Sequence, residues 1–147
     1  LKDFFEANGQ DVVIPEDIHH EKWLKFMTNT CFNTLTALLE ADYDATGSNR
    51  DMIRAARLIA KEVQSVGRRR GVELTSDDIE TMIRNTSMLS GKGRSSMLED
   101  MLSGRETENR YFAGSVSRMG KLYSIATPYC DLLSILVEAK RYVTTCH

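Results

Sequence analysis

Residues 22–40 read KWLKFMTNTCFNTLTALLE, and this stretch decides the fold. In an α-helix, successive residues are turned by about 100° around the axis. At that angle six polar side chains of this stretch gather in a stripe about 80° wide, and only threonines 28, 30 and 34 lie outside it. Most side chains around the rest of the circumference are apolar, so most of the helix should be buried. We therefore predict a long helix over about residues 17–41 with one narrow polar stripe: Lys22, Lys25, Asn29, Asn33, Thr36 and Glu40.

The polar stripe contains Asn29 and Asn33, which are poor helix formers and cost about half a kcal/mol each relative to alanine. A face that only meets solvent would more naturally carry Glu, Lys, Arg or Gln. One interpretation is a solvated stripe on a core helix, which composition alone slightly favours. The other is a pocket wall, in which the carboxamides hydrogen-bond a small polar ligand and Lys25 is its charged partner.

The remainder of residues 16–147 is also predicted to be helical. The sequence contains two prolines, Pro15 and Pro128, and proline is the residue that most strongly interrupts helix interiors. Thr127-Pro128 has the pattern of a helix start with proline in the first turn. We predict an all-α domain in which a polar turn at 42–49 and a loop at 90–94 separate helices at about 50–70, from 75 onward, 95–103, 106–120 and 127–143.

The first fifteen residues do not match this pattern. Residues 1–7 read as a short amphipathic helix that ends at Asn8-Gly9, and Val12-Val13-Ile14 is a β-branched run closed by Pro15. A helix followed by a strand is half of an α/β unit, and nothing later in the sequence supplies a sheet for it. We expect the chain to be a fragment of a longer protein, with residues 1–15 as the remnant of a preceding domain.

A second polar motif is Ser95-Ser96-Met97-Leu98-Glu99-Asp100, which follows a glycine-rich loop and opens an apolar helix. Helix capping explains most serines in such a place. The alternative is the capture of an anion by the free N–H groups of the helix. Glu108 lies in the first turn of the next predicted helix, where an acidic side chain usually only interacts favourably with the helix dipole.

Composition excludes several classes of function. The chain of 147 residues suits one domain, and 19 Lys and Arg against 21 Asp and Glu give a formal net charge of −2, without the basic excess of a general nucleic-acid binder. No apolar run approaches the roughly 18 residues that a membrane span needs. The cysteines are three in number and scattered, which favours a reducing cytoplasm. His19-His20 lacks a ligand at metal-binding spacing, so we expect no metal.

Together these motifs resemble the C-terminal domain of the ketopantoate reductase (2-dehydropantoate 2-reductase) family. The resemblance rests on the Lys-x-x-x-Asn-x-x-x-Asn helix, on Ser-Ser-Met-Leu-x-Asp, and on a glutamate twelve residues after the second serine. Thr127-Pro128 fits downstream, and the resemblance covers almost the whole chain. One departure is Gly93, because many members have an asparagine at that place. A related 2-keto acid therefore stays open as the natural substrate.

The resemblance implies an all-α domain of the 6-phosphogluconate dehydrogenase C-terminal type that closes the substrate cleft of an NADPH-binding Rossmann domain. It implies that Lys25 is the general acid, that Asn29 and Asn33 orient the substrate, and that Ser96 binds its carboxylate. It further implies that Glu108 organises the lysine and the nicotinamide-ribose end of the cofactor. A fragment of this kind is expected to be inactive alone, because no dinucleotide site occurs in these residues.

The rival interpretation is a non-catalytic all-α module for dimerisation or interaction. Such a module does not need a lysine, two asparagines, a serine and a glutamate at fixed places, whereas a reductase needs them to meet on one concave surface. A homodimer is compatible with either interpretation, because half of a two-domain enzyme exposes an apolar face.

Overall fold

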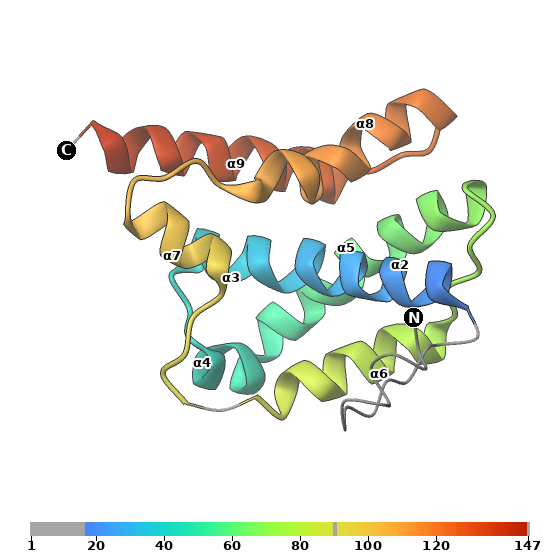
Figure 1. Ribbon diagram of the computed structural model, residues 1–147, viewed down its shortest axis with the longest axis horizontal. Helices are drawn as coiled ribbons and strands as arrows, with labels where there is room; N and C mark the ends of the chain where they lie inside the picture. Colours follow the sequence, from blue (N-terminus) through green and yellow to red (C-terminus); the bar gives the residue numbers. More distant parts are fainter. Residues whose placement is uncertain (1–16, 90, 147) are drawn as a thin grey trace, which may run out of the picture.

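The structure is a computed structural model that describes residues 17–89 and 91–146 (Figure 1). Every regular element within these residues is a helix, which confirms the predicted all-α domain. The predicted α/β remnant at residues 1–15 lies outside the described residues. The elements are α2 (Ile18–Thr28), η1 (Asn29–Asn33), α3 (Thr34–Leu39), α4 (Tyr43–Ser48), α5 (Arg50–Arg69), α6 (Ser76–Ser87), α7 (Ser96–Leu102), η2 (Glu108–Tyr111), α8 (Ala113–Tyr123) and α9 (Pro128–Thr145).

The predicted long helix forms the centre of the domain as α2, η1 and α3 in direct succession. In Figure 1 it runs horizontally, with α8 and α9 above it and α4 and α6 below it, while α5 crosses behind it. Its apolar side chains are buried mainly against α5, α7 and α9. Burial of each large side chain, such as Phe32, Leu35 or Ile59, contributes about 2 kcal/mol by removing apolar area from water.

Two predicted segments differ from the structure. Residues 42–49, predicted as a turn, contain the short helix α4, because the Asp42 side chain accepts a hydrogen bond from the Ala45 backbone N–H at 2.9 Å and caps its first turn. The helix predicted at about 106–120 is divided. Its first part, η2, is a 3-10 turn, and Phe112, with φ −102° and ψ −102°, separates it from α8, which continues to Tyr123.

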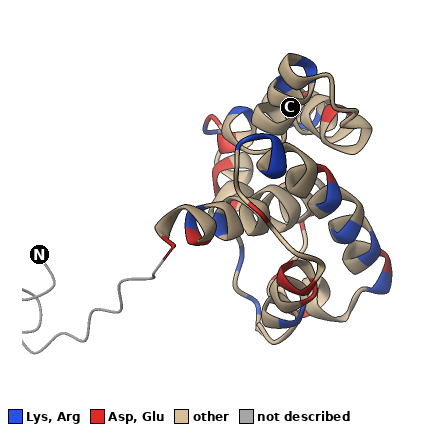
Figure 2. Cartoon of the chain, turned by 90° about the vertical axis from the view of Figure 1, so that its right-hand side faces the viewer, with Lys and Arg blue, Asp and Glu red and all other residues tan. Residues whose placement is uncertain are grey.

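The surface carries charges of both signs, as Figure 2 shows along the described helices. The best-aligned pair is Arg57 with Glu80, in which Nε lies 2.8 Å from Oε1 and Nη2 lies 2.9 Å from Oε2. Exposed pairs of this kind contribute at most about 1 kcal/mol, so the fold depends on its apolar core. Across residues 17–89 and 91–146, no helix combines the length and the apolar character that crossing a membrane requires.

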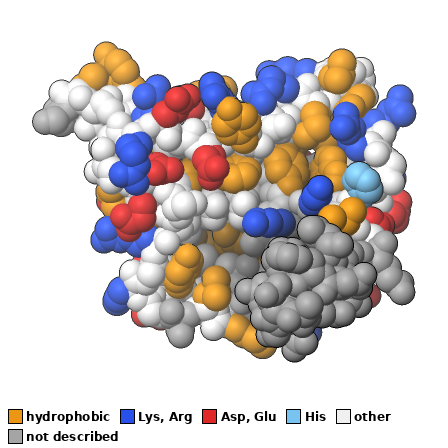
Figure 3. All heavy atoms as spheres, in the orientation of Figure 1, with side chains coloured by type: hydrophobic (Ala, Val, Ile, Leu, Met, Phe, Trp, Pro, Cys, Tyr) orange, Lys and Arg blue, Asp and Glu red, His pale blue; other side chains and the backbone are white. Residues whose placement is uncertain are grey.

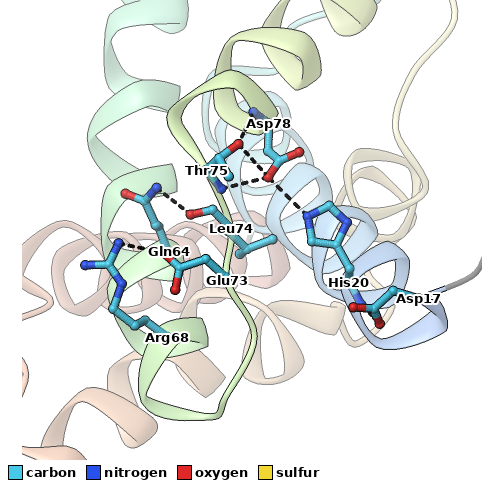
Figure 4. A network of polar contacts seen from close by, with 8 residues as sticks. All are labelled: Asp17, His20, Gln64, Arg68, Glu73, Leu74, Thr75 and Asp78. Carbon is cyan, nitrogen blue, oxygen red and sulfur yellow. Dashed lines mark hydrogen bonds and ion pairs between the residues drawn. The ribbon is translucent and has the colours of Figure 1, made fainter.

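A capping box at the start of α6 ties this helix to α2 (Figure 4). The Asp78 carboxylate accepts hydrogen bonds from the Thr75 backbone N–H at 2.7 Å and from the Thr75 hydroxyl at 2.9 Å. Nε2 of His20, on α2, lies 3.1 Å from the same carboxylate oxygen. Burial alone would raise the pKa of Asp78, but the hydrogen bonds from Thr75 and His20 outweigh it and hold the pKa below its ordinary value.

Replacing Asp78 with alanine is expected to lower the free energy of unfolding by about 1 to 2 kcal/mol near neutral pH, because the cap and the His20 contact are lost. The folded-state pKa of Asp78 is below the unfolded-state value, so its contribution is complete above about pH 4 and is lost as the pH falls through the folded-state pKa. Urea unfolding should show the variant approaching the wild type as the pH falls below about 4.

Asp77→Ala is the matched control, because Asp77 lies in the same helical turn but is exposed and outside the capping box. A difference between Asp78→Ala and wild type that grows toward acid pH would contradict the assignment.

Candidate functional site

The polar stripe of the central helix contains a π-helical turn, η1, whose first and last residues are Asn29 and Asn33. The prediction of a uniform α-helix is therefore wrong in this turn. A π turn is closed by i→i+5 bonds and takes in one more residue than an α turn, so it changes the directions of the side chains that it carries. Such turns are rare and are found frequently at functional sites. Both asparagines are partly exposed, which leaves their carboxamides accessible to a ligand.

Lys25 lies one turn before the π turn and is exposed. It lines a groove of about 240 Å³ between α2 and α6, together with Thr28 of its own helix and Asn85 of α6. On the other side of α2, Lys22 and Phe26 line a groove of about 210 Å³ against α8. The exposed face of α2 thus forms a ridge between two grooves. Figure 3 shows this side of the molecule, where basic side chains lie beside hydrophobic ones.

The C-terminal end of the predicted polar stripe contains one buried and one exposed side chain. Thr36 is 1% exposed, so its expected place on a polar face is wrong. Its hydroxyl instead lies 2.7 Å from the hydroxyl of Ser95. Glu40 is exposed and ends the helix in the left-handed region, at φ 53°, where its carboxylate lies 3.1 Å from Nζ of Lys140.

The two adjacent serines before α7 have different surroundings. Ser95 is buried and is the N-cap of α7, because its hydroxyl accepts a hydrogen bond from the Leu98 N–H at 3.2 Å. The capping interpretation is therefore correct for Ser95. Ser96 is the first residue of α7 and is exposed, so its hydroxyl is not used for the cap.

Glu108 is the exposed first residue of η2. The next residue, Asn109, is 1% exposed and fastens η2 to α9, because its Nδ2 donates to the Ser134 carbonyl and to Glu138 Oε1, both at 3.0 Å. The backbone at Glu108 is therefore fixed while its carboxylate stays accessible. Sequence reasoning missed Asn109, although a buried asparagine beside a candidate site residue needs partners for both its donor hydrogens.

Gly93, the one departure from the family motif, lies directly against the ring of Tyr43. A Cβ atom built at Gly93 would be 2.7 Å from two carbons of that ring, which is too close for any side chain without movement of the tyrosine. The Tyr43 hydroxyl also donates to the Arg94 carbonyl at 3.1 Å. The aromatic ring thus occupies the space that the side chain of a larger residue at position 93 would need.

The structure brings some of the predicted site residues together and leaves others apart. Lys25, Asn29 and Asn33 share the central helix, and α7, which carries Ser96, packs against η1 and α3. The segment that carries Glu108 packs against α8 and α9. Among the described residues, no hydrogen bond joins any two of these five side chains. That all five contact one ligand therefore stays a prediction.

Other groups in the described residues offer less chemistry. Residues 17–89 and 91–146 contain no group of three His, Cys, Asp or Glu side chains placed to hold a metal ion. Cys31 and Cys130 are buried free thiols, and burial raises the pKa of both, which keeps them protonated and unreactive.

The chain is similar in sequence to known proteins. Residues 17–141 match the family described as Ketopantoate reductase PanE/ApbA C terminal. The chain is 31% identical over 140 residues to the 2-dehydropantoate 2-reductase of Pyrobaculum aerophilum, a match that covers 95% of this chain and 50% of that protein. The chain spans about half the length of the curated relatives it matches.

Solved structures share the same fold. A ternary structure of D-mandelate dehydrogenase with NADH and anilino(oxo)acetate matches with a TM-score of 0.85 and 28% identity, covering 97% of this chain and 60% of that one. A structure described as a dimeric ketopantoate reductase from Staphylococcus aureus matches with a TM-score of 0.83 and 19% identity, covering 97% of this chain and 50% of that one.

Proposed function

This chain belongs to the ketopantoate reductase C-terminal domain family, and from that premise we propose that it is the substrate-side domain of an NADPH-dependent reductase that converts ketopantoate to pantoate, in the synthesis of pantothenate and coenzyme A. The observation that supports this most is the accessible face of the central helix. There an ammonium group and two carboxamides follow one another at four-residue spacing, and the second carboxamide ends a π turn.

In this proposal each site residue has one task. When bound, the reduced nicotinamide supplies a hydride to C2 of the keto acid. Lys25 Nζ donates a proton to the C2 oxygen, and its charge stabilises the negative charge that develops there. Asn29 and Asn33 orient the hydroxyl and keto groups of the substrate, and Ser96 binds its carboxylate. Glu108 organises the lysine and the ribose beside the nicotinamide.

The cofactor needs a second domain. A dinucleotide fold requires parallel strands with glycine-rich turns, and every regular element within residues 17–89 and 91–146 is a helix. In this proposal the helical domain forms one wall of the nicotinamide site, where the accessible Glu108 would contact the ribose. We propose that an N-terminal Rossmann domain of the same chain supplies the rest, and that the present residues are inactive without it. The free, buried thiols support a reducing compartment, which we propose to be the cytoplasm.

Steady-state kinetics of the full-length protein test this function. NADPH oxidation should be fastest with ketopantoate in a panel that includes the 2-keto acid corresponding to mandelate. Because Gly93 stands where many family members have an asparagine, one hydrogen bond to ketopantoate is expected to be absent or to come from another group, and a related 2-keto acid is the alternative substrate. An absence of oxidation with every 2-keto acid would leave the rival proposal, a non-catalytic interaction module.

We also propose that the full-length protein forms a homodimer through α9. This helix exposes a stripe of apolar side chains at helical spacing, among them Leu132 at 55%, Ile135 at 65% and Leu136 at 39% exposure. A shallow apolar groove of about 140 Å³, lined by Leu58, Tyr129 and Leu132 among others, continues this stripe toward α5. A cluster of exposed apolar side chains on one helix supports a protein interface there.

Replacing Ile135 with glutamate is expected to shift the dimer to monomer at micromolar concentration, because a charge would be buried at the interface without a partner. Sedimentation velocity measures the shift. Lys121→Glu, a charge reversal at an exposed position of α8, is the control and should leave the dimer intact. A wild type that sediments as a monomer would rule out this interface.

A further inference from the structure

A buried chain of hydrogen bonds connects the end of the π turn with the start of α7. The Thr36 hydroxyl lies 3.1 Å from the Asn33 carbonyl oxygen and 2.7 Å from the Ser95 hydroxyl, and the Leu98 N–H lies 3.2 Å from the Ser95 oxygen. Thr36 is 1% exposed and Ser95 is 5% exposed, so solvent does not replace these bonds. The two hydroxyl residues are 59 positions apart in the sequence.

Only one arrangement of protons satisfies all three contacts. Each hydroxyl has a single hydrogen to donate. Thr36 must donate to the Asn33 carbonyl, because a carbonyl can only accept. Ser95 must then donate to Thr36 Oγ1, and it accepts from the Leu98 N–H. Both hydroxyl protons are used within this series of hydrogen bonds, so neither is available to a ligand.

We propose that Thr36 and Ser95 are positioning residues that set the distance between the two segments that hold the keto acid. This inference rests on the proposed function, in which Asn33 orients one part of the substrate and Ser96 binds its carboxylate. At one end of this hydrogen-bonded series, the backbone carbonyl of Asn33 accepts from the Thr36 hydroxyl. Ser96 directly follows Ser95 at the other end. The substrate would therefore bridge on the surface the same two segments that the hydroxyl pair bridges inside.

The packing around the pair explains why such a link is needed. The underside of α7 is apolar, with Met97 and Met101 fully buried against Ala37 of α3. Apolar contacts of this kind are not directional and allow small shifts along the helix. The hydroxyl pair adds a directional contact at the end of α7 that carries Ser96. A small error in the position of a substrate-binding group is costly for catalysis, because orientation contributes much of the rate.

Kinetics of full-length variants test this role. Thr36→Val keeps the side-chain shape but removes the hydroxyl, and we expect the KM for the keto acid to rise about tenfold, the size of one lost hydrogen bond to a charged group. The KM for NADPH should not change. Thr36→Ser restores the hydroxyl and should restore the KM. Ser95→Ala should reproduce the effect of Thr36→Val, and it serves as the second variant if Thr36→Val does not fold.

The matched control is Thr86→Val, because Thr86 is also a buried helical threonine whose hydroxyl donates to a backbone carbonyl, that of Met82, at 2.9 Å. It lies on α6, apart from the hydroxyl pair, and should leave both KM values unchanged. Thermal unfolding of all variants separates a loss of stability from a loss of position.

A double-mutant cycle with Ser96 distinguishes positioning from general damage. Ser96→Ala alone should raise the KM for the keto acid about tenfold. In that background Thr36→Val should add little, because the distance no longer matters once one end of the substrate is free. A full additional tenfold increase, or an unchanged KM in Thr36→Val with an active wild type, would overturn the positioning role alone. A wild type inactive toward every 2-keto acid would instead overturn the proposed function, and the positioning role with it.

Discussion

Replacing Lys25 with alanine in the full-length protein is expected to lower kcat for keto acid reduction by a factor of about 10² to 10⁴, the usual contribution of a positioned general acid. The ammonium group would both donate the proton and stabilise the charge on the substrate oxygen, so its loss acts on the transition state more than on substrate binding. We therefore expect the KM for the keto acid to change much less than kcat. Steady-state NADPH oxidation measures both parameters.

The central helix itself provides the control. Lys22 is also an exposed lysine in the same polar stripe, one turn earlier, but it lines the opposite groove with Trp23 and Phe26. Lys22→Ala should retain kcat. Equal losses in the two variants would show that the rate responds to the overall charge of the helix, and an unchanged kcat in Lys25→Ala would remove this lysine from the mechanism.

Replacing Glu62 with alanine is expected to lower the free energy of unfolding by about 3 to 5 kcal/mol, the largest effect on stability that the structure predicts. Glu62, on α5, is 6% exposed, and its two carboxylate oxygens accept from the backbone N–H groups of Tyr129 and Cys130 at 2.9 and 2.8 Å. It therefore caps the first turn of α9 from another helix. Its removal leaves two N–H groups at that turn without an acceptor.

Urea unfolding of the alanine variant measures this effect, and two further variants separate its causes. Glu62→Gln keeps one carbonyl acceptor, so it should lose about half as much. Glu73→Ala removes an exposed glutamate that pairs with Arg68 and should change stability by at most about 0.5 kcal/mol. If Glu62→Ala lost no more than Glu73→Ala, the cap would not be a significant part of the fold.

Sequence periodicity predicted most of the fold because it depends on local spacing. The central helix follows from its apolar repeat, the start of α9 from the proline in its first turn, and the cap of α7 from Ser95 beside it. The prediction of a turn at residues 42–49 was wrong because the composition of this segment is typical of a turn. Its helix is capped by the Asp42 side chain and packs against α6, which is distant in the sequence.

The parts that the sequence did not predict depend on distant partners or on an assumed geometry. Thr36 fits the polar stripe, yet it is buried because its partner, Ser95, lies on another helix. Glu62 reads as a surface residue until α9 is placed over it. The π turn was missed because the polar stripe was drawn at the regular 100° of an α-helix. The roles of Lys25, Asn29, Asn33, Ser96 and Glu108 stay predictions.

A crystal structure of the full-length protein with NADP⁺ and the keto acid tests the proposed roles of Lys25 and Ser96 most directly. We predict that Lys25 Nζ lies about 3 Å from the C2 oxygen of the keto acid, and that Ser96 Oγ lies at a similar distance from its carboxylate. A keto acid bound with its C2 oxygen against other groups, and with Lys25 directed into solvent, would contradict the proposed role of Lys25 as the general acid.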